Sequence, residues 1–512
     1  MKLLSYSNRK RRIVFWLLLG AGVIARIAGL GLWPPGLNQD EASAGYEAWS
    51  LLHYGTDRNG WSWPVLFVAW GSGQNVLYSY LSIPLIALFG LNETVLRVPA
   101  ALFGCLSLPL FAALGKKLRG EEFSLWALAA LALNPWHTGI SRWALESNLL
   151  PFWLLLGTTM LVFAEDRPPL LAGAAAAFAL ALYAYGTAYF FLLFFLPPAF
   201  FLLLKRRRVP GNWVALSAGV FILMALPLTA CHLRNALGMD GTRFLCFSLP
   251  KLNESRQSSV SALGGGFSSV GANLKTFFRL LWTQSDGLVW NSGGPAGLIY
   301  GKPGLLLAIF GLTVTVAERR GVQEKNGEGY LLCALPAVLL SACLIDGNVN
   351  RLNMAFLPLI WYQAAGAAGL CRKWRGAVWP LGAALLAGFL LFGRWYITDG
   401  ARSTGDAFFC GLGDAIAYAA ALEEESVFIS FDVNMPYIYV LFYEQIPPEE
   451  YLDTRVLMNP GGAFEWVSEF GGFRFGRTPP PDGTLCIVKS RDAVGAAMTE
   501  AVFGSWAVCR FG

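Results

Sequence analysis

The chain has 512 residues, of which 55% are hydrophobic and only 14% are charged, and its mean hydropathy is +0.48. A soluble protein of this length needs more charge to cover its surface, so the composition predicts a polytopic α-helical membrane protein. The net charge of +6 is unevenly divided, because residues 399–512 hold 16 Asp and Glu against 7 Lys and Arg. We therefore expect a basic transmembrane domain over 1–398 and an acidic soluble domain over 399–512.

Eleven apolar runs are candidates for transmembrane helices. A further run, 76–90, would reach only about 22 Å at ~1.5 Å per residue, short of a ~30 Å hydrocarbon core. If this run does not cross the membrane, the main basic clusters, which hold 19 of the 39 Lys and Arg, all fall on the same side of the membrane. The positive-inside rule requires this arrangement. We therefore expect 76–90 to lie along the outer membrane surface. The eleven runs are 13–33, 95–115, 122–136, 148–164, 168–186, 188–204, 213–230, 303–317, 329–345, 352–370 and 377–396.

This count predicts a multi-pass protein of the cell membrane with a cytoplasmic N-terminus. Lys10-Arg11-Arg12 precedes an apolar run that is too long for a signal peptide and has no cleavage site, so it is expected to be an uncleaved first helix. Two long outer loops, 34–94 and 231–302, and the C-terminal domain then lie outside the cytoplasm. The inner loops are short and basic, so a functional site is expected on the outer face. An enzyme there would take its activated donor from the membrane.

The soluble parts have weaker patterns. Residues 270–282 place apolar and basic side chains on different faces, which predicts a helix in the membrane plane. In the C-terminal domain, strands are expected at 426–431 and 484–490 and a helix at 494–503, which together predict a small open α/β sheet. The nine cysteines have no metal-ligand spacing, and disulfides are possible among Cys231, Cys246, Cys410, Cys486 and Cys509.

Two adjacent acids, Asp40 and Glu41, directly follow the first apolar run. One interpretation is a helix N-cap, since an Asp followed by a Glu suits the positive end of a helix over "EASAGYEAWSLLHYG". The other is a general base that removes a proton from an acceptor hydroxyl. The two interpretations are compatible.

Several segments resemble the GT-C superfamily of membrane glycosyltransferases. They are "NQDEASAGYEAWSLLHYGTDRNGWSWPV", "VLYSYLSIPLIALFG", "TVLRVPAALFG" and "LALNPWHTGISRWALESNLLPF", with looser likeness at "QSDGLVWN", "NRLN" and "PYIYVLFYE". The chain is most similar to the protein-mannosyltransferase-like and aminoarabinose-transferase-like branch, near glycosyltransferase family 39. The resemblance implies a polyprenyl-phosphate sugar donor, inversion at the sugar carbon, Asp40 as catalytic base and Glu41 as the neighbour that holds geometry or a donor hydroxyl.

A lipid phosphate needs cations at the membrane surface, and arginine suits it through its bidentate fork. Arg97, Arg142 and Arg351 are the candidates, with headgroup contact as the alternative for the first two and a salt bridge to Asp346 for the third. Arg26, inside the first run, needs a partner, either an acid such as Glu146 or the substrate. Glu146 is itself expected to orient Arg142, to bind the sugar, or to be structural.

The leading hypothesis is therefore glycosyl transfer to an acceptor hydroxyl on a protein, a glycolipid or a wall polymer of the cell envelope. No metal, no other cofactor and no nucleic acid are expected. A transporter or flippase of lipid-linked sugars is the alternative, and it predicts internal repeats and charges at mid-membrane in several helices. As a charge at mid-membrane the sequence has chiefly Arg26, and it has no obvious internal repeat. A non-catalytic scaffold would tolerate Asp40→Ala.

Overall fold

The computed structural model describes residues 6–69, 73–253, 267–319, 327–462 and 464–512. Their contacts divide the chain into two compact units, each formed by three separate segments. We call them the helical unit (Met1–Leu30, Ala100–Leu226 and Gln257–Gly400) and the sheet unit (Gly31–Pro99, Pro227–Arg256 and Ala401–Gly512). The sequence places a boundary at 398/399, but residues 31–99 and 227–256 also belong to the unit that contains the C-terminal segment.

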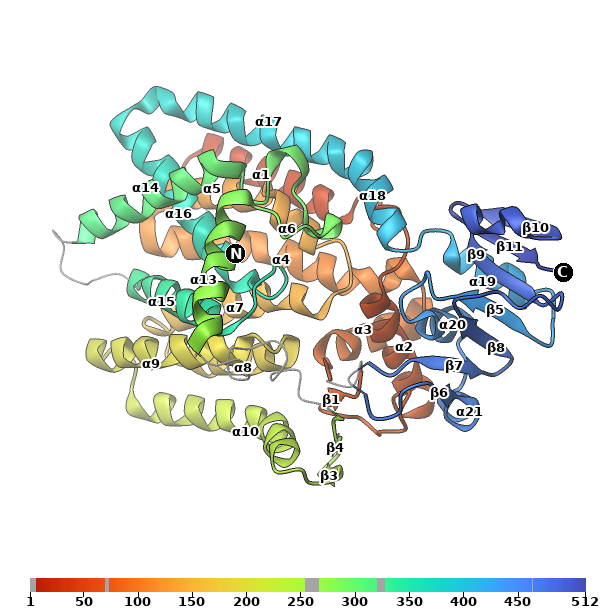
Figure 1. Cartoon of the computed structure of the whole chain (residues 1–512). Coiled ribbons are helices and arrows are strands. Elements are labelled where there is room, and N and C mark those ends of the chain that lie inside the picture. The colour runs from red at the N-terminus through yellow and green to blue at the C-terminus, as the bar shows by residue number, and fades with distance from the viewer. Residues whose placement is uncertain (1–5, 70–72, 254–266, 320–326, 463) are drawn as a thin grey trace. The chain divides into compact units, whose positions relative to one another are not determined.

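Each of the eleven predicted apolar runs forms a helix (Figure 1). Seven helices of the described residues are long and apolar enough to cross a membrane, which confirms a multi-pass helical protein. The remaining four, α1, α5, α8 and α15, lie outside this set, so a total near eleven stays a prediction. The bounds are α1 (Arg9–Ile27), α4 (Glu93–Arg119), α5 (Glu121–Ala132), α7 (Leu150–Ala164), α8 (Leu170–Ala184), α9 (Ala188–Arg206), α10 (Gly211–Ala236), α14 (Gly301–Arg319), α15 (Glu328–Leu344), α16 (Phe356–Lys373) and α17 (Val378–Ile397).

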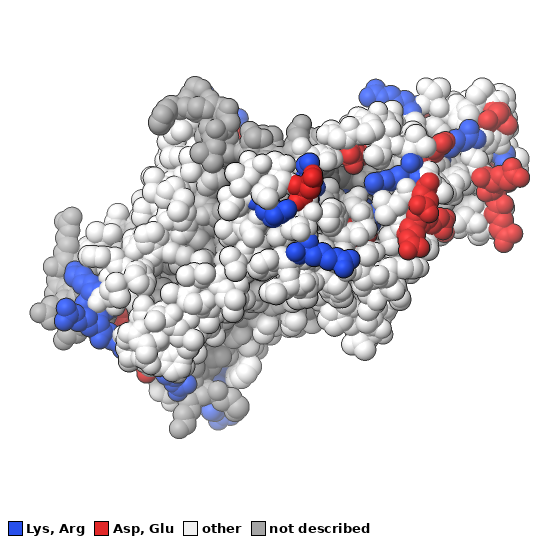
Figure 2. Space-filling view, turned by 90° about the horizontal axis from the view of Figure 1, so that it is seen from below, with Lys and Arg blue, Asp and Glu red and all other residues white. Residues whose placement is uncertain are grey.

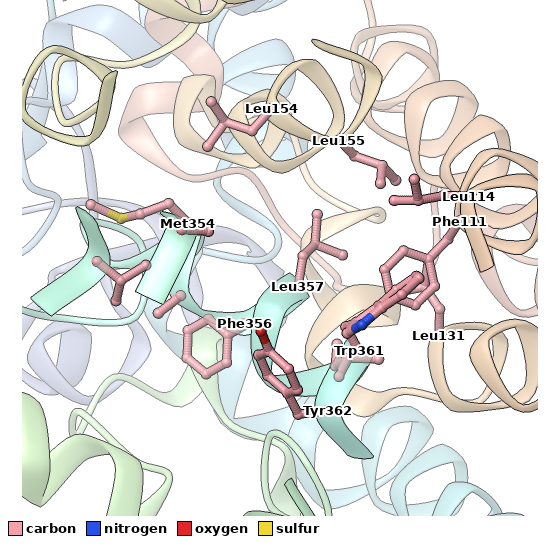
Figure 3. Close-up of a cluster of buried hydrophobic side chains, with 14 of the residues drawn as sticks. Phe111, Leu114, Leu131, Leu154, Leu155, Met354, Phe356, Leu357, Trp361 and Tyr362 are labelled. Atoms are coloured by element: carbon pink, nitrogen blue, oxygen red, sulfur yellow. The ribbon is translucent and has the colours of Figure 1, made fainter. Parts of the chain in front are cut away.

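The core of the helical unit is built from large apolar side chains. Trp361 of α16 is buried, and its ring meets Phe111 of α4 edge-on, with ring centroids 5.6 Å apart. Leu154 and Leu357 belong to the same cluster (Figure 3). The face in Figure 2 has wide areas without Lys, Arg, Asp or Glu, and large apolar side chains such as Leu193 and Phe201 are exposed on the helices. Helices that are apolar on all sides are typical of membrane bundles.

Two shorter helices form where the sequence predicts them. The run 76–90 forms α3 (Leu77–Phe89), a helix of 13 residues, and the amphipathic segment forms α13 (Phe267–Thr283). Residues 254–266 of the outer loop 231–302 lie outside the described residues. The position of both helices relative to the membrane stays a prediction.

The sheet unit contains a seven-stranded mixed sheet with the order β10-β11-β9-β5-β8-β7-β6. β5 pairs in parallel with β8 and β9, and the other pairs are antiparallel. Helices α19 (Leu412–Ala420), α20 (Pro436–Glu444) and α21 (Pro448–Thr454) accompany it (Figure 1), which confirms an α/β domain. The strands are β5 (Val427–Ser430), β6 (Val456–Leu457), β7 (Val467–Phe470), β8 (Phe473–Gly476), β9 (Leu485–Lys489), β10 (Met498–Phe503) and β11 (Trp506–Arg510).

The prediction of a helix at 494–503 is wrong. Residues Met498–Phe503 form strand β10, which makes a hairpin with β11 through Gly504 and Ser505, and Phe503 pairs with Trp506. Gly504 has φ 61°, a conformation that favours glycine and suits a two-residue hairpin turn. Gly471 and Gly472, with φ 53° and 84°, join β7 to β8 in the same way. A Gly-Ser and a Gly-Gly pair between apolar segments were the available signals.

The first outer loop begins with helix α2 (Gln39–Tyr54), which packs against α20 (Figure 1). The Tyr46 hydroxyl donates to the Ile446 carbonyl at 2.7 Å, although 400 residues separate them. A Cβ atom added at Gly45 would lie 2.6 Å from the Phe442 ring, so glycine allows the close approach. Short hairpins β1–β2 (Leu66–Phe67, Gln74–Asn75) and β3–β4 (Thr242–Phe244, Phe247–Leu249) complete the sheet unit. All nine cysteines are unpaired, including Cys486 and Cys509, which are register partners on β9 and β11.

Candidate functional site

The acid pair lies in the first turn of α2, but Asp40 is not the N-cap. Asn38 is the N-cap, and its side-chain oxygen accepts from the Asp40 backbone N–H at 2.9 Å. Glu41 completes a capping box, since its Oε2 accepts from the Asn38 backbone N–H at 3.0 Å. The capping interpretation of Asp40 is therefore corrected. The half-buried Asp40 side chain lies at the positive end of the helix, where capping is supplied by its neighbours.

Glu41 forms a buried ion pair with Arg97 at the start of α4. The Arg97 Nε and Nη2 atoms donate to the two carboxylate oxygens at 2.8 and 2.9 Å, and both residues have 0% exposure. The same guanidinium donates to the carbonyls of Pro34 and Gly36, each at 2.6 Å. Arg97 therefore ties the loop before α2 to Glu41. Its burial does not fit the headgroup contact, and a phosphate-binding role for Arg97 stays a prediction.

Helix α20 places a second group beside the acid pair. Tyr439 is 1% exposed, and its hydroxyl has no hydrogen-bond partner among the described residues. Burial raises the pKa of this phenol well above its usual range, and the negative charges of Asp40 and Glu41 raise it further. The hydroxyl is thus a neutral donor near two carboxylates. Asn434, which precedes α20, also donates to Gln39 of α2.

No sequence pattern singled out Tyr439. The segment "PYIYVLFYE" stood out only through its looser family likeness. The available signal was a set of three tyrosines on an otherwise apolar helix, because buried tyrosine hydroxyls usually find a partner. Tyr443 does so, since it donates to Glu93 Oε1 at 2.8 Å and thereby holds the start of α4.

A second buried cluster on α2 was also missed. Glu47, Asp57 and Arg58 are at most 2% exposed. Arg58 Nη1 lies 3.3 Å from Glu47 Oε1 and donates to the Ser43 hydroxyl at 2.8 Å. Burial raises the pKa of Asp57 well above its usual range, and the nearby Glu47 charge adds to this. Burial and the Glu47 charge thus both favour the neutral form of the Asp57 carboxyl group.

Arg142, in the helical unit, binds backbone carbonyls at the end of α1. Its Nη1 donates to the Ala25 carbonyl at 2.8 Å, and its Nη2 donates to those of Ala28 and Gly29 at 2.8 and 3.1 Å. A cation there satisfies carbonyls that have no partner within the helix and suits the negative end of its dipole. The guanidinium carbon also lies 5.6 Å from the Tyr396 ring centroid. Arg142 therefore caps the C-terminal end of α1.

Arg26 is buried without a carboxylate among its contacts. Its Nη atoms donate to the carbonyls of Gly22, Ala132 and Leu131 at 2.7 to 3.1 Å, and its Nη2 lies 2.8 Å from His137 Nδ1. The Nε atom faces the same ring nitrogen at 3.3 Å. All five guanidinium N–H groups are thus used. The expected pairing with Glu146 is not formed.

The remaining candidates belong to the helical unit. Arg351 Nη1 donates to the Asp346 carbonyl at 2.9 Å and lies 3.5 Å from Asp346 Oδ2. The Arg351 side chain is 24% exposed, so it is accessible in a way that Arg97 and Arg142 are not. Glu146 is buried at the start of a 3-10 turn (Glu146–Leu149). Among the described residues, no group of three His, Cys, Asp or Glu could hold a metal ion.

Comparison with known proteins confirms the expected resemblance. Residues 74–230 match the family model described as dolichyl-phosphate-mannose-protein mannosyltransferase. This segment contains Arg97, Arg142 and Glu146 but not Asp40, Glu41 or Arg351. Among curated protein sequences, none matches the chain.

The fold is similar to that of ArnT from Cupriavidus metallidurans bound to undecaprenyl phosphate. The TM-score is 0.57 at 12% identity, over 96% of this chain and 97% of that chain. The apo state of the same protein gives 0.48 at 14% identity, over the same shares of both chains. The apo oligosaccharyltransferase of Archaeoglobus fulgidus gives 0.47 at 12% identity, over 86% of this chain and 64% of that chain. Only the first score exceeds 0.5, and at 12% identity it shows a shared fold.

Proposed function

We propose that this protein is an integral membrane glycosyltransferase that moves a sugar from a polyprenyl-phosphate donor to an acceptor hydroxyl. The family match over 74–230 and the fold shared with ArnT bound to undecaprenyl phosphate support the donor class. The reaction takes place on the extracytoplasmic face, with the N-terminus in the cytoplasm. This orientation rests on the positive-inside distribution of Lys and Arg.

The observation that carries the proposal is the division of roles in the first turn of α2. Asn38 and Glu41 cap the helix, and Arg97 holds Glu41 from the other side. Asp40 lies between two residues that are fixed in this way. A half-buried carboxylate at a defined helix position supports its assignment as a general base.

In the proposed reaction, the acceptor oxygen attacks C1 of the sugar as its proton passes to Asp40. The bond between C1 and the phosphate oxygen breaks, and polyprenyl phosphate leaves with the electron pair. Attack opposite the leaving group inverts C1. Arg351, as the most accessible of the three candidate arginines, binds the phosphate and stabilises its added charge.

The other candidates act through these groups. Arg97 positions Glu41, and through it the turn that carries Asp40. Arg142 fixes the end of α1, and Glu146 contributes to the sugar site or orients Arg142. The Tyr439 hydroxyl supplies a neutral hydrogen-bond donor beside the acids.

The test compares wild type with Asp40→Asn in nanodiscs. Undecaprenyl-phosphate hexoses with radiolabelled sugar are the donors, and host membrane extract is the acceptor. We expect wild type to transfer label and Asp40→Asn to lose at least 100-fold in rate while it still binds donor, because general base catalysis contributes about 10²–10⁴-fold. Asp453→Asn is the matched control, because Asp453 is exposed on α21 and should leave the rate unchanged.

Full turnover by Asp40→Asn would reject Asp40 as the base without rejecting the enzyme. A wild type that transfers no label from any donor but moves lipid-linked sugar across the bilayer in a flipping assay would replace the proposal by the transporter alternative.

A further inference from the structure

The helical unit contains a cavity of about 1780 Å³ that none of the residues discussed above lines. Its walls come from α1, α5 and α17, with Leu17, Trp126 and Leu386 as examples. The ends of α4 and α14 and the starts of α15 and α17 form one rim. The cavity is therefore separate from the groups assigned to the proposed reaction.

The walls and the rim differ in chemistry. The walls are mainly Leu, Val, Ala, Phe and Trp side chains, whereas the charged residues of the cavity belong to the helix ends at the rim. The apolar walls offer water no polar partners, so this part of the cavity favours apolar chains over water. Unfilled space of this size would also forfeit dispersion contacts along its walls. The cavity thus fits an amphiphile with apolar chains and one polar end.

The rim carries an arginine that belongs to none of the ion pairs among the described residues. Glu328 pairs with Arg119, Glu318 with Arg372, and Glu122 with Arg11. Arg375 also lines the cavity, and its guanidinium has no partner among the described residues. A phosphate at this end would meet an arginine whose donors are not used by another side chain.

Two neighbouring tryptophans indicate the level of this rim in a bilayer. Trp374 and Trp379 are 64% and 81% exposed on either side of Arg375. Exposed tryptophans at the end of a spanning helix are typical of the headgroup level. The window of α17 that could span is only 11% buried, so this helix meets hydrocarbon along most of its length. The rim and the walls therefore match the headgroup and chain regions of the bilayer.

We propose that this cavity binds an anionic glycerophospholipid, with its phosphate on Arg375 and its acyl chains between α1, α5 and α17. Basic pockets between membrane helices are known to bind anionic headgroups. The site is independent of the proposed reaction, since its polar contact is Arg375 and not a residue of the acid pair. A lipid here would stabilise α17 against the bundle by binding only the folded protein.

Gly382 offers a way to fill the cavity. A Cβ atom at this position of α17 meets nothing within 4 Å, and Gly382 lines the cavity. We expect Gly382→Phe to lower the copurified phospholipid, measured by native mass spectrometry, at least tenfold. Gly219→Phe is the matched control, because Gly219 on α10 also meets nothing within 4 Å but lies outside the cavity. It should keep the wild-type lipid content.

The headgroup contact is tested by adding dioleoyl phosphatidylglycerol or dioleoyl phosphatidylcholine to delipidated protein and measuring Tm. Phosphatidylglycerol should raise the Tm of wild type more than phosphatidylcholine does, and Arg375→Glu should remove this difference. Lys373→Glu, which changes a nearby cation outside the cavity, should retain it.

Equal phospholipid content in Gly382→Phe and wild type would overturn the proposal. An equal response to both headgroups would overturn the role of Arg375. Copurification of polyprenyl phosphate alone, lost in Gly382→Phe, would assign the cavity to the donor and not to a phospholipid.

Discussion

The sheet unit and the helical unit both bury arginines, but they compensate the charge differently. Arg97 faces a carboxylate, and the two charges form a bidentate pair with 0% exposure. Arg26 faces three backbone carbonyls and a histidine nitrogen, and no carboxylate is among its contacts. Arg97 combines one carboxylate with the carbonyls of Pro34 and Gly36, whereas Arg26 has three carbonyls and a histidine nitrogen.

The two arginines therefore differ in what their removal would cost. A carboxylate that loses its arginine remains as an uncompensated buried charge, which is costly. Carbonyls at the ends of α1 and α5 lose only hydrogen bonds, and each such bond has a modest net value. Arg97 thus holds the helix turn that carries Asp40, whereas Arg26 joins two helix ends. Substitutions can test this contrast, from the largest expected effect to the smallest.

Arg97→Met should have the largest effect on stability. It leaves Glu41 buried without its cation, and removing one partner of a buried pair costs roughly 3–5 kcal/mol. The free energy of unfolding, measured by denaturant titration in detergent, should fall by this amount. The double variant Glu41→Gln, Arg97→Met should recover part of the loss. A loss below 1 kcal/mol for the single variant would contradict the assignment.

Arg26→Met should cost less, on the order of 1–3 kcal/mol, because it removes hydrogen bonds but leaves no unpaired carboxylate. The same titration measures it. His137→Phe is a useful companion, since it removes one Arg26 partner and keeps the three carbonyls. A loss as large as that of Arg97→Met would remove the contrast between the two arginines.

Asp57→Asn should change how stability depends on pH. The folded-state pKa of Asp57 is raised, so the folded protein keeps a proton that the unfolded chain releases above about pH 4. Wild-type stability should therefore fall by about 1.4 kcal/mol per pH unit from that point up to the folded pKa, relative to Asp57→Asn. Asn keeps the oxygen that accepts from the Asn59 and Trp61 N–H groups. Parallel pH profiles for both proteins would exclude a proton held at Asp57.

Tyr439→Phe should have the smallest effect on stability, within about 1 kcal/mol of wild type, since the hydroxyl has no partner to lose. Its effect on transfer should be larger, because the phenol is a donor beside the acids. The measurement compares the loss of transfer rate with the loss of stability in the same variant. Tyr443→Phe, which breaks a bond to Glu93, should reverse this ratio and lower stability more than rate.

The helices of this fold could be predicted from sequence because apolar runs need no distant partner to be recognised. β10 could not, since "VGAAMTEAVF" is rich in good helix formers, and only pairing with β11 makes it a strand. The acid pair could be placed at the start of a helix. The choice of Asn38 as the cap and of Arg97 as the partner of Glu41, 56 residues away, depends on packing that no local pattern records. The same holds for Tyr439 and for the cluster at Asp57.

The three-segment construction of the sheet unit affects how the protein is made. Residues 31–99 leave the ribosome well before residues 401–512, which supply α20 and most of the strands. At ~5–20 residues per second, the roughly 300 intervening residues take on the order of 15–60 s to synthesise. During that interval α2 has no α20 to cover it, and the surface that later meets Phe442 and Tyr439 is open to other contacts. The α2 surface therefore reaches its final packing only after the last segment of the chain has been made.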